Sequence, residues 1–341
     1  MVTTELTRHD PDVVVIGGGQ AGLATGYYLQ RARLSFVILD DQPAPGGAWR
    51  HTWPSLTLFS TAGFSNLPGL PMPSYDGFPP ASHVIDYLAA YEARYGLPVE
   101  RPVRVERIGW GGGIFHVRTD RRTWRARAVV SATGTWSRPF VPWYPGRFAG
   151  RQWHSAGYPG PEPFAGSRVA VVGGANSAAQ IAAELSAVAD LDWYTLQPPR
   201  WMPDDVDGRI LFRRNRQRML ALTRGEPDPG PASRLGDIIM VPPVLEAREA
   251  GRLVATPMFE RLDQVVADHL VWCTGFRPAL GHLRGLLADR TPQVPGLHLV
   301  GYGDWTGPGS ATLAGVAPGA RQAVEEIERL LTSGPAPAED D

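Results

Sequence analysis

Short runs of consecutive apolar residues recur along the chain and are separated by segments rich in glycine and proline. Such runs predict strands that are buried on both faces, as in a parallel sheet covered by helices. Segments with apolar residues at helical spacing follow several of the runs, and this alternation predicts an α/β fold. The predicted buried strands are Val13–Ile16, Phe36–Leu39, Ala128–Ser131, Val169–Val172, Leu270–Trp272 and Leu297–Val300.

Two further helices are predicted outside the strand-to-helix turns. Val84, Leu88 and Tyr91 have helical spacing, so we expect a helix over 83–95 with Ser82 as its N-cap and Gly96 as its stop. Ser310 is expected to cap a last helix that continues to Leu331.

A different pattern occupies 103–126, where short apolar stretches alternate with polar or glycine-rich turns. The stretches Val103–Val105, Ile114–Thr119 and Thr123–Ala126 predict strands of a small antiparallel insert, with Gly111–Gly113 as one turn. In contrast, 51–80 has little periodicity and many proline, glycine and aromatic residues. A loop of this length inside a domain is usually functional, and we expect it to cover a ligand.

The first apolar run leads directly into a glycine-rich turn and a helix. Gly17, Gly19 and Gly22 have the G-x-G-x-x-G spacing of a dinucleotide-binding turn. The first glycine permits the tight turn, the second lets backbone approach a pyrophosphate, and the third lets helix and strand pack closely. The next strand ends at Asp40 and Asp41, where a carboxylate is expected to bind a ribose hydroxyl.

The same arrangement begins again in the middle of the chain, so the dinucleotide-binding unit is repeated. Gly173 opens the second turn, but Ala175 and Ala178 occupy the positions of the second and third glycines. The methyl group of Ala175 crowds a pyrophosphate, which predicts weak or readily reversible binding. Its second strand leads to Arg200 and not to a carboxylate, an arrangement that favours NADP over NAD. A solvated surface arginine is the alternative interpretation.

Composition narrows the class of protein. The chain has 341 residues, of which 43% are hydrophobic and 20% charged, as expected for a globular protein of two domains. The net charge of -1 gives no long-range attraction to nucleic acid or anionic lipid. No apolar run is long enough to span a bilayer and the first ten residues lack a signal-peptide pattern, so we expect a cytoplasmic protein without a membrane or nucleic-acid partner.

Cysteine and histidine usage excludes several kinds of site. Cys273 is the single cysteine, so an internal disulfide, a C-x-x-C redox pair and a multi-thiolate metal site are excluded. The eight histidines form no metal-binding motif, and no metal site is expected. A cluster of arginines between 204 and 234 is interpreted mostly as a solvated face, with one or two side chains that could help hold an NADP phosphate: Arg209, Arg213, Arg214, Arg216 and Arg218.

Nearly the whole chain, 12–331, resembles the flavin-dependent monooxygenases of class B, which use FAD and NADPH. The spacing Phe148-x-Gly150-x-x-x-His154-x-x-x-Tyr158 matches the signature of that group. Four segments look most like its short ArsO-type branch, namely 46–49, 203–209, 300–307 and 310–313.

The resemblance implies two Rossmann-like dinucleotide-binding domains in a three-layer α/β fold, with the NADPH domain inserted into the FAD domain. The FAD-binding domain would comprise 1–147 and 271–332, and the NADPH-binding domain 148–270. The remaining residues, 333–341, would form a disordered tail. A homodimer is a possible assembly for such a chain.

The resemblance also implies which residues lie at the cofactors. Residues near FAD would be Gly17, Gly19, Gln20, Ala21, Gly22, Asp40, Asp41, Gly47, Ala48, Trp49, Val103, Gly303, Asp304, Thr312 and Leu313. The linker motifs that border the cofactors would be Thr133–Gly134 and Thr274–Gly275. NADPH would lie across the second turn, with the 2'-phosphate near Arg200, and would contact Gly173, Ala175, Asn176, Ser177 and Ala178.

The chemistry implied by the resemblance is oxygenation of a small molecule by O2. NADPH would reduce FAD, and a C4a-hydroperoxyflavin would transfer one oxygen atom to a soft nucleophile at a sulfur, nitrogen or arsenic centre. Many relatives provide an asparagine donor where this chain offers Ser60 or Thr61, each of which can donate one hydrogen bond. His154 would couple domain movement to turnover, and a structural loop histidine is the alternative. Tyr158, in place of the tryptophan usual in Baeyer–Villiger enzymes, favours heteroatom oxygenation.

Two other functions stay open from the sequence. The chain could be an FAD-dependent NADPH oxidoreductase that passes electrons to a quinone or a protein without oxygenation. It could also be a non-catalytic flavoprotein. The substrate itself cannot be read from the residues, and a lone cysteine provides no three-thiolate site for arsenic.

Overall fold

The first sheet consists of five parallel strands, and the strands at its centre are buried on both faces. The structure, a computed structural model, describes residues 10–332, so the tail predicted over 333–341 lies outside the described residues. The strand order is β15-β7-β1-β2-β3. These strands are β1 Val13–Ile16, β2 Phe36–Leu39, β3 Val99–Glu100, β7 Ala128–Ser131 and β15 Leu297–Leu299.

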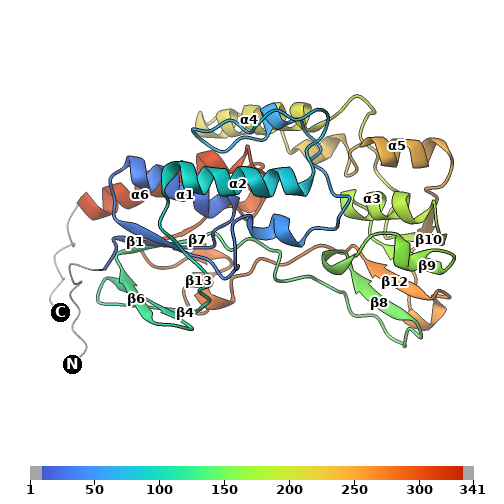
Figure 1. Ribbon diagram of the computed structural model, residues 1–341, viewed down its shortest axis with the longest axis horizontal. Coiled ribbons are helices and arrows are strands. Elements are labelled where there is room, and N and C mark those ends of the chain that lie inside the picture. The colour runs from blue at the N-terminus through green and yellow to red at the C-terminus, as the bar shows by residue number, and fades with distance from the viewer. Residues whose placement is uncertain (1–9, 333–341) are drawn as a thin grey trace.

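The two faces of this sheet are covered by different layers, because successive side chains of a strand point to opposite sides. Val13 and Val15 face a core shared with three helices, whereas Val14 and Ile16 face a three-stranded antiparallel sheet. Figure 1 shows the helices on one side of the parallel strands and the small sheet on the other. The covering elements are the helices α1 Gln20–Arg31, α2 Ala81–Tyr95 and α6 Val316–Thr332, and the strands β4 Val105–Gly111, β5 Ile114–Thr119 and β6 Thr123–Ala126.

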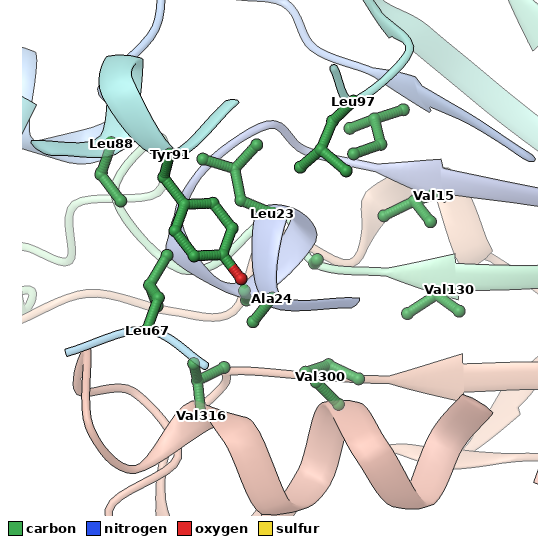
Figure 2. Close-up of a cluster of buried hydrophobic side chains, with 14 of the residues drawn as sticks. Val15, Leu23, Ala24, Leu67, Leu88, Tyr91, Leu97, Val130, Val300 and Val316 are labelled. Carbon is green, nitrogen blue, oxygen red and sulfur yellow. The ribbon is translucent and has the colours of Figure 1, made fainter. Parts of the chain in front are cut away.

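Tyr91 of α2 shows how the helical layer is fixed. Its ring is fully buried and lies beside Leu23 and Ala24 of α1 (Figure 2). Its hydroxyl donates a 2.7 Å hydrogen bond to the carbonyl of Pro68, so the polar end of the ring is satisfied. Burial of this kind stabilises the position of α1, which carries the first glycine turn at its start.

The second sheet is also parallel and has the order β11-β10-β9-β12-β8. It is formed by residues between 151 and 272, whereas the strands of the first sheet lie before and after that range. The fold class predicted from the sequence, an α/β protein with two Rossmann-like units, is therefore confirmed. The elements of the second unit are β8 Arg151–His154, β9 Arg168–Val172, α3 Asn176–Leu185, β10 Asp190–Thr195, α4 Gly208–Thr223, α5 Pro242–Glu249, β11 Ala255–Pro257 and β12 His269–Trp272; a two-stranded β13 Leu287–Ala288 and β14 Thr291–Pro292 follows it.

Several predicted boundaries differ from the structure. The last helix begins at Val316 and not at Ser310, because the Ser310 hydroxyl is 2.7 Å from the Gly303 carbonyl and ties a loop together instead of capping a helix. The helix predicted from Ser82 begins at Ala81, with Pro80 before it. Val103 lies outside the antiparallel sheet, whose first strand runs on to Gly111.

The long segment 51–80 was expected to cover a ligand, but much of it joins the two units. Trp53 is 8% exposed and belongs to the hydrophobic core of the second unit. Leu58, Leu67 and Met72 belong instead to the core beneath α1 and α2. The segment therefore crosses between the two hydrophobic cores.

Candidate functional site

A cavity of about 680 Å³ opens at the carboxyl ends of β1 and β2. In an α/β sheet this edge is where ligands bind. Twelve of the residues expected at FAD or its linker motifs line it, namely Gly17, Gly19, Gln20, Ala21, Asp40, Asp41, Gly47, Ala48, Trp49, Val103, Thr133 and Gly134. Those that do not line it are Gly22, Thr274, Gly275, Gly303, Asp304, Thr312 and Leu313.

The glycines of the first turn have different structural roles. Gly17 has φ +101°, and a Cβ there would lie 2.5 Å from the Ala132 carbonyl oxygen. A Cβ on Gly22 would lie 1.8 Å from the carbonyl oxygen of Gly17, so only glycine lets α1 start this close to β1. A Cβ on Gly19 would have more room, because its nearest neighbour would be Cα of Gly47 at 3.9 Å. The backbone N–H groups at the start of α1 are thus left accessible to an anion.

The two carboxylates after β2 differ in environment. Asp40 is 3% exposed, and its Oδ2 accepts a 2.7 Å hydrogen bond from Nε of Arg101. Burial raises the pKa of Asp40 above its ordinary value, although Arg101 opposes that shift. Asp41 is exposed and accepts a 2.7 Å bond from the Gln42 side chain. Both line the cavity, so either carboxylate can meet a ribose there.

Gln20 joins three segments at the start of α1. Its Oε1 accepts a 3.2 Å hydrogen bond from the Trp49 indole, and its amide donates a 2.7 Å bond to the Ala311 carbonyl. The loop 301–313 is held in turn by Asp304, which accepts from the Gly309 N–H at 3.1 Å. Leu313 is buried in the core beside α1, so its side chain packs against protein.

A second cavity, of about 390 Å³, lies at the second glycine turn and includes residues of both units. Ala175 and Asn176 of that turn line it together with Thr312 from the first unit. Gly173, Ser177, Ala178 and Arg200 lie outside its lining. The remaining lining residues are Phe59, Gly174, Met202, Leu211, Phe212, Asn215, Ser233, Gly236, Asp237 and Ile239.

Contacts within the second turn restrict what each predicted residue can offer. Oδ1 of Asn176 accepts a 2.8 Å hydrogen bond from the Ile239 N–H, which leaves the amide group as a donor. Gly173 has φ +142°, and a Cβ there would lie 2.5 Å from the Cys273 carbonyl oxygen. Ala178 is 1% exposed and packs in the core of the second unit.

Arg200 is neither free nor deeply buried. Its Nη2 donates a 2.7 Å hydrogen bond to the Ser233 carbonyl, and its Nη1 lies 3.5 Å from Oδ2 of Asp237. Half of the Arg200 side chain, 52%, is exposed. Because Ser233 and Asp237 line the second cavity, the guanidinium stands beside the cavity and a bound phosphate would compete with Asp237 for it.

The predicted catalytic hydroxyls lie outside both cavities. Ser60 is 2% exposed, and its hydroxyl forms a 2.8 Å hydrogen bond with that of Ser65. Thr61 precedes a short helical turn and accepts a hydrogen bond from Ser65 through its carbonyl. The structure does not bring either side chain to a cavity.

His154 links the end of β8 to the chain that returns to the first unit. Its Nδ1 accepts a 3.0 Å hydrogen bond from the Ala156 N–H, so Nε2, 3.1 Å from the Gly275 carbonyl, carries the proton and donates. Burial lowers the pKa of His154, which keeps the ring neutral. Both ring nitrogens are therefore occupied by backbone.

The two linkers between the units pair with each other. Phe140 donates a 3.0 Å backbone hydrogen bond to Gly275, and Arg277 donates one of 2.8 Å to Arg138. Thr274 adds a side-chain bond to the carbonyl of Phe140. Figure 1 shows these two stretches running between the units. Thr274 and Gly275 thus hold the connection between the units, while Thr133 and Gly134 line the first cavity.

Sequence reasoning missed several charged residues that shape the site. Arg218 was grouped with a solvated face, but it binds Asp228 at 2.9 Å and reaches Asp304 of the other unit at 3.5 Å. Arg101 and Asp237 were not identified at all. Arg101 bonds Asp40, which is 61 positions away, and Asp237 pairs with Arg200 of another segment, so no local sequence pattern predicts these pairs.

Within residues 10–332, no group of three or more His, Cys, Asp or Glu side chains could hold a metal ion. The same part of the chain contains no helix that is both long and apolar enough to cross a bilayer. Cys273 is fully buried, and burial raises the pKa of its thiol, which makes a reactive thiolate unfavourable.

Comparison with known proteins agrees with the fold of two Rossmann-like units. The model of the family described as pyridine nucleotide-disulphide oxidoreductase matches residues 14–298. A flavin-containing monooxygenase from Stenotrophomonas maltophilia is 46% identical, with a TM-score of 0.84 over 94% of this chain and 99% of that one. An oxidoreductase of Geobacillus kaustophilus described as CzcO-like is 28% identical over 94% of this chain and 99% of its own length. The indole-3-pyruvate monooxygenase YUCCA1 of rice is 33% identical over 51% of this chain and 45% of its own.

Proposed function

The chain belongs to the pyridine nucleotide-disulphide oxidoreductase family and, within it, to the flavin monooxygenases, and from this premise we propose that it is an NADPH-consuming enzyme that oxygenates a small molecule at a soft nucleophilic atom. It is therefore an enzyme, and FAD and a nicotinamide dinucleotide are the cofactors of its family. Use of NADPH and the kind of atom oxygenated are the parts that we infer.

One observation carries this proposal: each glycine turn opens into a cavity, and the second cavity is lined by residues of both units. Thr312 comes from the loop that is tied to the first turn through Ala311 and Gln20. A dinucleotide on the second turn could therefore extend toward the first unit. The residues fit the expected groups, because the first turn offers unpaired N–H groups and nearby carboxylates while the second offers an amide and an adjacent guanidinium.

When bound, FAD would accept a hydride and activate O2. The protein has to hold the two cofactors against each other and exclude water. Phe59 and Phe212, with ring centroids 6.1 Å apart, form an apolar wall of the second cavity together with Leu211 and Met202. Gln20 and Asp304 hold the loop 301–313 against the start of α1 and the turn at Gly309. We place His154 in the connection between the units, where it maintains the position of the return linker and transfers no proton.

The second cavity also bears on the substrate. Its walls are mostly apolar, and Asp237 is the one ionisable side chain in its lining. The apolar wall formed by Phe59, Phe212, Leu211 and Met202 favours a small apolar substrate, for which a sulfide or an amine is the natural nucleophile. Cys273 is buried and offers no thiolate to an arsenical, so we place sulfur and nitrogen centres before arsenic.

The test is an oxygenation screen with the purified FAD-loaded enzyme, NADPH and O2. Sulfides, tertiary amines and organoarsenicals are supplied separately, and products are identified by mass spectrometry. We expect at least one sulfide or amine to gain a single oxygen atom in proportion to the NADPH consumed. NADPH oxidation that depends on a quinone, without an oxygenated product, would instead support the electron-transfer oxidoreductase. Absence of NADPH oxidation with every acceptor would support a non-catalytic flavoprotein.

A further inference from the structure

A buried arginine lies beneath the first glycine turn and joins three segments. The Arg101 side chain is 9% exposed. Its Nε donates to Oδ2 of Asp40 at 2.7 Å, and its Nη1 and Nη2 donate to the two carboxylate oxygens of Glu92 at 2.6 and 2.8 Å. Nη2 also lies 3.5 Å from the carbonyl oxygen of Gly18. The guanidinium thus connects the end of β2, helix α2 and the turn itself.

Gly18 provides independent evidence that the Arg101–Asp40 ion pair is packed against the glycine turn. Position 18 is a variable position of the G-x-G-x-x-G spacing, so the motif itself does not require glycine there. A Cβ on Gly18 would lie 2.7 Å from Oδ2 of Asp40 and 2.8 Å from Nη2 of Arg101. Glycine at this position therefore makes room for the pair, and the pair supports the turn from below.

We propose that Arg101 is a positioning residue for FAD, which orients the Asp40 carboxylate toward the ribose of the adenosine half. Arg101 bonds Oδ2 of Asp40, and Asp40 lines the cavity in which the ribose would lie. Glu92 holds the guanidinium through two hydrogen bonds, so its plane and its Nε direction are fixed. The inference rests on FAD binding at the first turn, and it holds whether or not the enzyme oxygenates its substrate.

The charges around Asp40 define what Arg101 contributes. Burial and the neighbouring Asp41 raise the pKa of Asp40, whereas Arg101 and the Gly18 backbone lower it. Glu92 faces Arg101 from α2 and offsets part of the positive charge. Without the guanidinium the pKa of Asp40 rises further, so the carboxylate is protonated more readily as the pH falls. A protonated Asp40 is a weaker acceptor for a ribose hydroxyl.

The primary experiment measures the dissociation constant of FAD with apoprotein and the Arg101→Met variant, by flavin fluorescence. Loss of a charge-assisted contact is expected to weaken FAD binding about tenfold or more at pH 7.5. The weakening should increase from pH 8.5 to pH 6 in the variant, while the wild-type constant stays flat over that range. Arg122→Met is the matched control, because Arg122 pairs with Glu100 at 3.2 Å but both side chains are about half exposed. It should bind FAD like the wild type.

An FAD analogue that lacks the 2'-hydroxyl on its adenosine ribose separates positioning from general stability. The wild type should bind FAD about tenfold more tightly than the analogue, and Arg101→Met should bind the two nearly equally. Arg101→Lys keeps a charge beside Asp40 but cannot bond Glu92 in the same way. Arg101→Lys should restore the wild-type pH dependence of the FAD dissociation constant, but only part of the preference for FAD over the analogue. It serves as the test protein if the methionine variant does not fold.

The proposal is overturned if Arg101→Met, or Arg101→Lys where the former is unfolded, retains the wild-type preference for FAD over the 2'-deoxy analogue. It is also overturned if Asp41→Asn abolishes that preference while the Arg101 variants keep it, because Asp41 would then be the ribose ligand. Thermal unfolding of the apoproteins is followed in parallel. Equal weakening of both ligands, in step with a lower unfolding temperature, would assign Arg101 a purely structural role.

Discussion

At the scale of single residues, the same side chain has very different roles according to its burial and partners. Arg101 is enclosed and holds two carboxylates, Arg122 makes an exposed pair, and Arg200 stands half exposed beside the second cavity. The sequence predicts a role for Arg200 because it follows a strand of the repeated unit. It predicts none for Arg101, since Asp40 and Glu92 become its neighbours only when β2, β3 and α2 come together.

The position of Arg200 beside the second cavity predicts that its side chain affects the KM for NADPH. Replacing Arg200 by glutamine should raise the KM for NADPH about tenfold through loss of a charge-assisted contact to the 2'-phosphate, with little change in the KM for NADH. Asp237→Asn is the matched variant, because it releases the guanidinium from its carboxylate and should lower the KM for NADPH. Steady-state kinetics with both nucleotides measure the effect. An equal change for NADPH and NADH would show that Arg200 does not contact the 2'-phosphate.

His282 gives a pH dependence whose sign follows from its burial. The imidazole is buried, forms a 3.0 Å hydrogen bond with the Ser131 hydroxyl, and has its pKa lowered to about 4. Because the folded pKa lies below the unfolded value near 6.5, the unfolded chain binds more protons between these values. This contribution to stability is complete above pH 6.5 and is lost as the pH falls toward 4.

Replacement of His282 by glutamine should remove that contribution. Between pH 7.5 and pH 4.5 the free energy of unfolding of the wild type should fall by on the order of 2 kcal/mol more than that of the variant. Urea unfolding at the two pH values measures this difference, with His116→Gln on strand β5 as a control that follows the wild type. Parallel losses in wild type and His282→Gln would contradict the assignment.

At the scale of elements, apolar runs predicted the buried strands well because burial on both faces leaves a continuous signal in the sequence. The glycine spacing likewise placed both turns, since close packing such as that of Gly22 on Gly17 admits no side chain. The start of α6 was misplaced because Ser310 has the composition of a cap but uses its hydroxyl to bind the Gly303 loop. Which core Trp53 would enter could not be predicted, because its neighbours belong to the other unit.

Trp53→Ala tests the role of the segment that crosses between the two cores. Removing a buried tryptophan should cost about 3 to 5 kcal/mol of stability. The dissociation constant of FAD should stay within about twofold of the wild type, since Trp53 lines neither cavity. Chemical unfolding and FAD titration provide the two measurements, and Trp53→Phe should show a smaller loss. A substrate-contact role would produce the opposite result, a changed KM with unaltered stability.

At the scale of the whole molecule, the structure holds the two units together in several ways that the sequence indicates only in part. Paired linkers run between them, and His154 binds the return linker at Gly275. Arg218 of α4 reaches Asp304 in the other unit. The repeat and the signature around His154 predict two dinucleotide sites. His154 and Gly275 are 121 positions apart and Arg218 and Asp304 are 86 apart, so these contacts depend on the folded chain.

Thr312 lines the second cavity and the preceding residue, Ala311, lines the first, and this arrangement has a functional consequence. We propose that a nicotinamide on the second turn and a flavin on the first approach each other beside the apolar wall formed by Phe59 and Phe212. Exclusion of water from the space beside this wall protects a reactive cofactor from side reactions that release hydrogen peroxide without oxygenating the substrate. An electron-transfer oxidoreductase has no need of this protection, and reduced enzyme should therefore behave differently toward O2 in the two cases.

The most direct measurement is rapid mixing of the NADPH-reduced enzyme with O2 in the absence of substrate, followed by absorbance. A monooxygenase is expected to pass through a transient species whose spectrum differs from those of both reduced and oxidised FAD, and the transient should last longer with NADP+ present. Addition of a substrate that the enzyme oxygenates in the screen should shorten the lifetime of the transient species and yield oxygenated product in place of hydrogen peroxide. Return to oxidised FAD in a single step, with stoichiometric hydrogen peroxide whether or not NADP+ is bound, would contradict a monooxygenase.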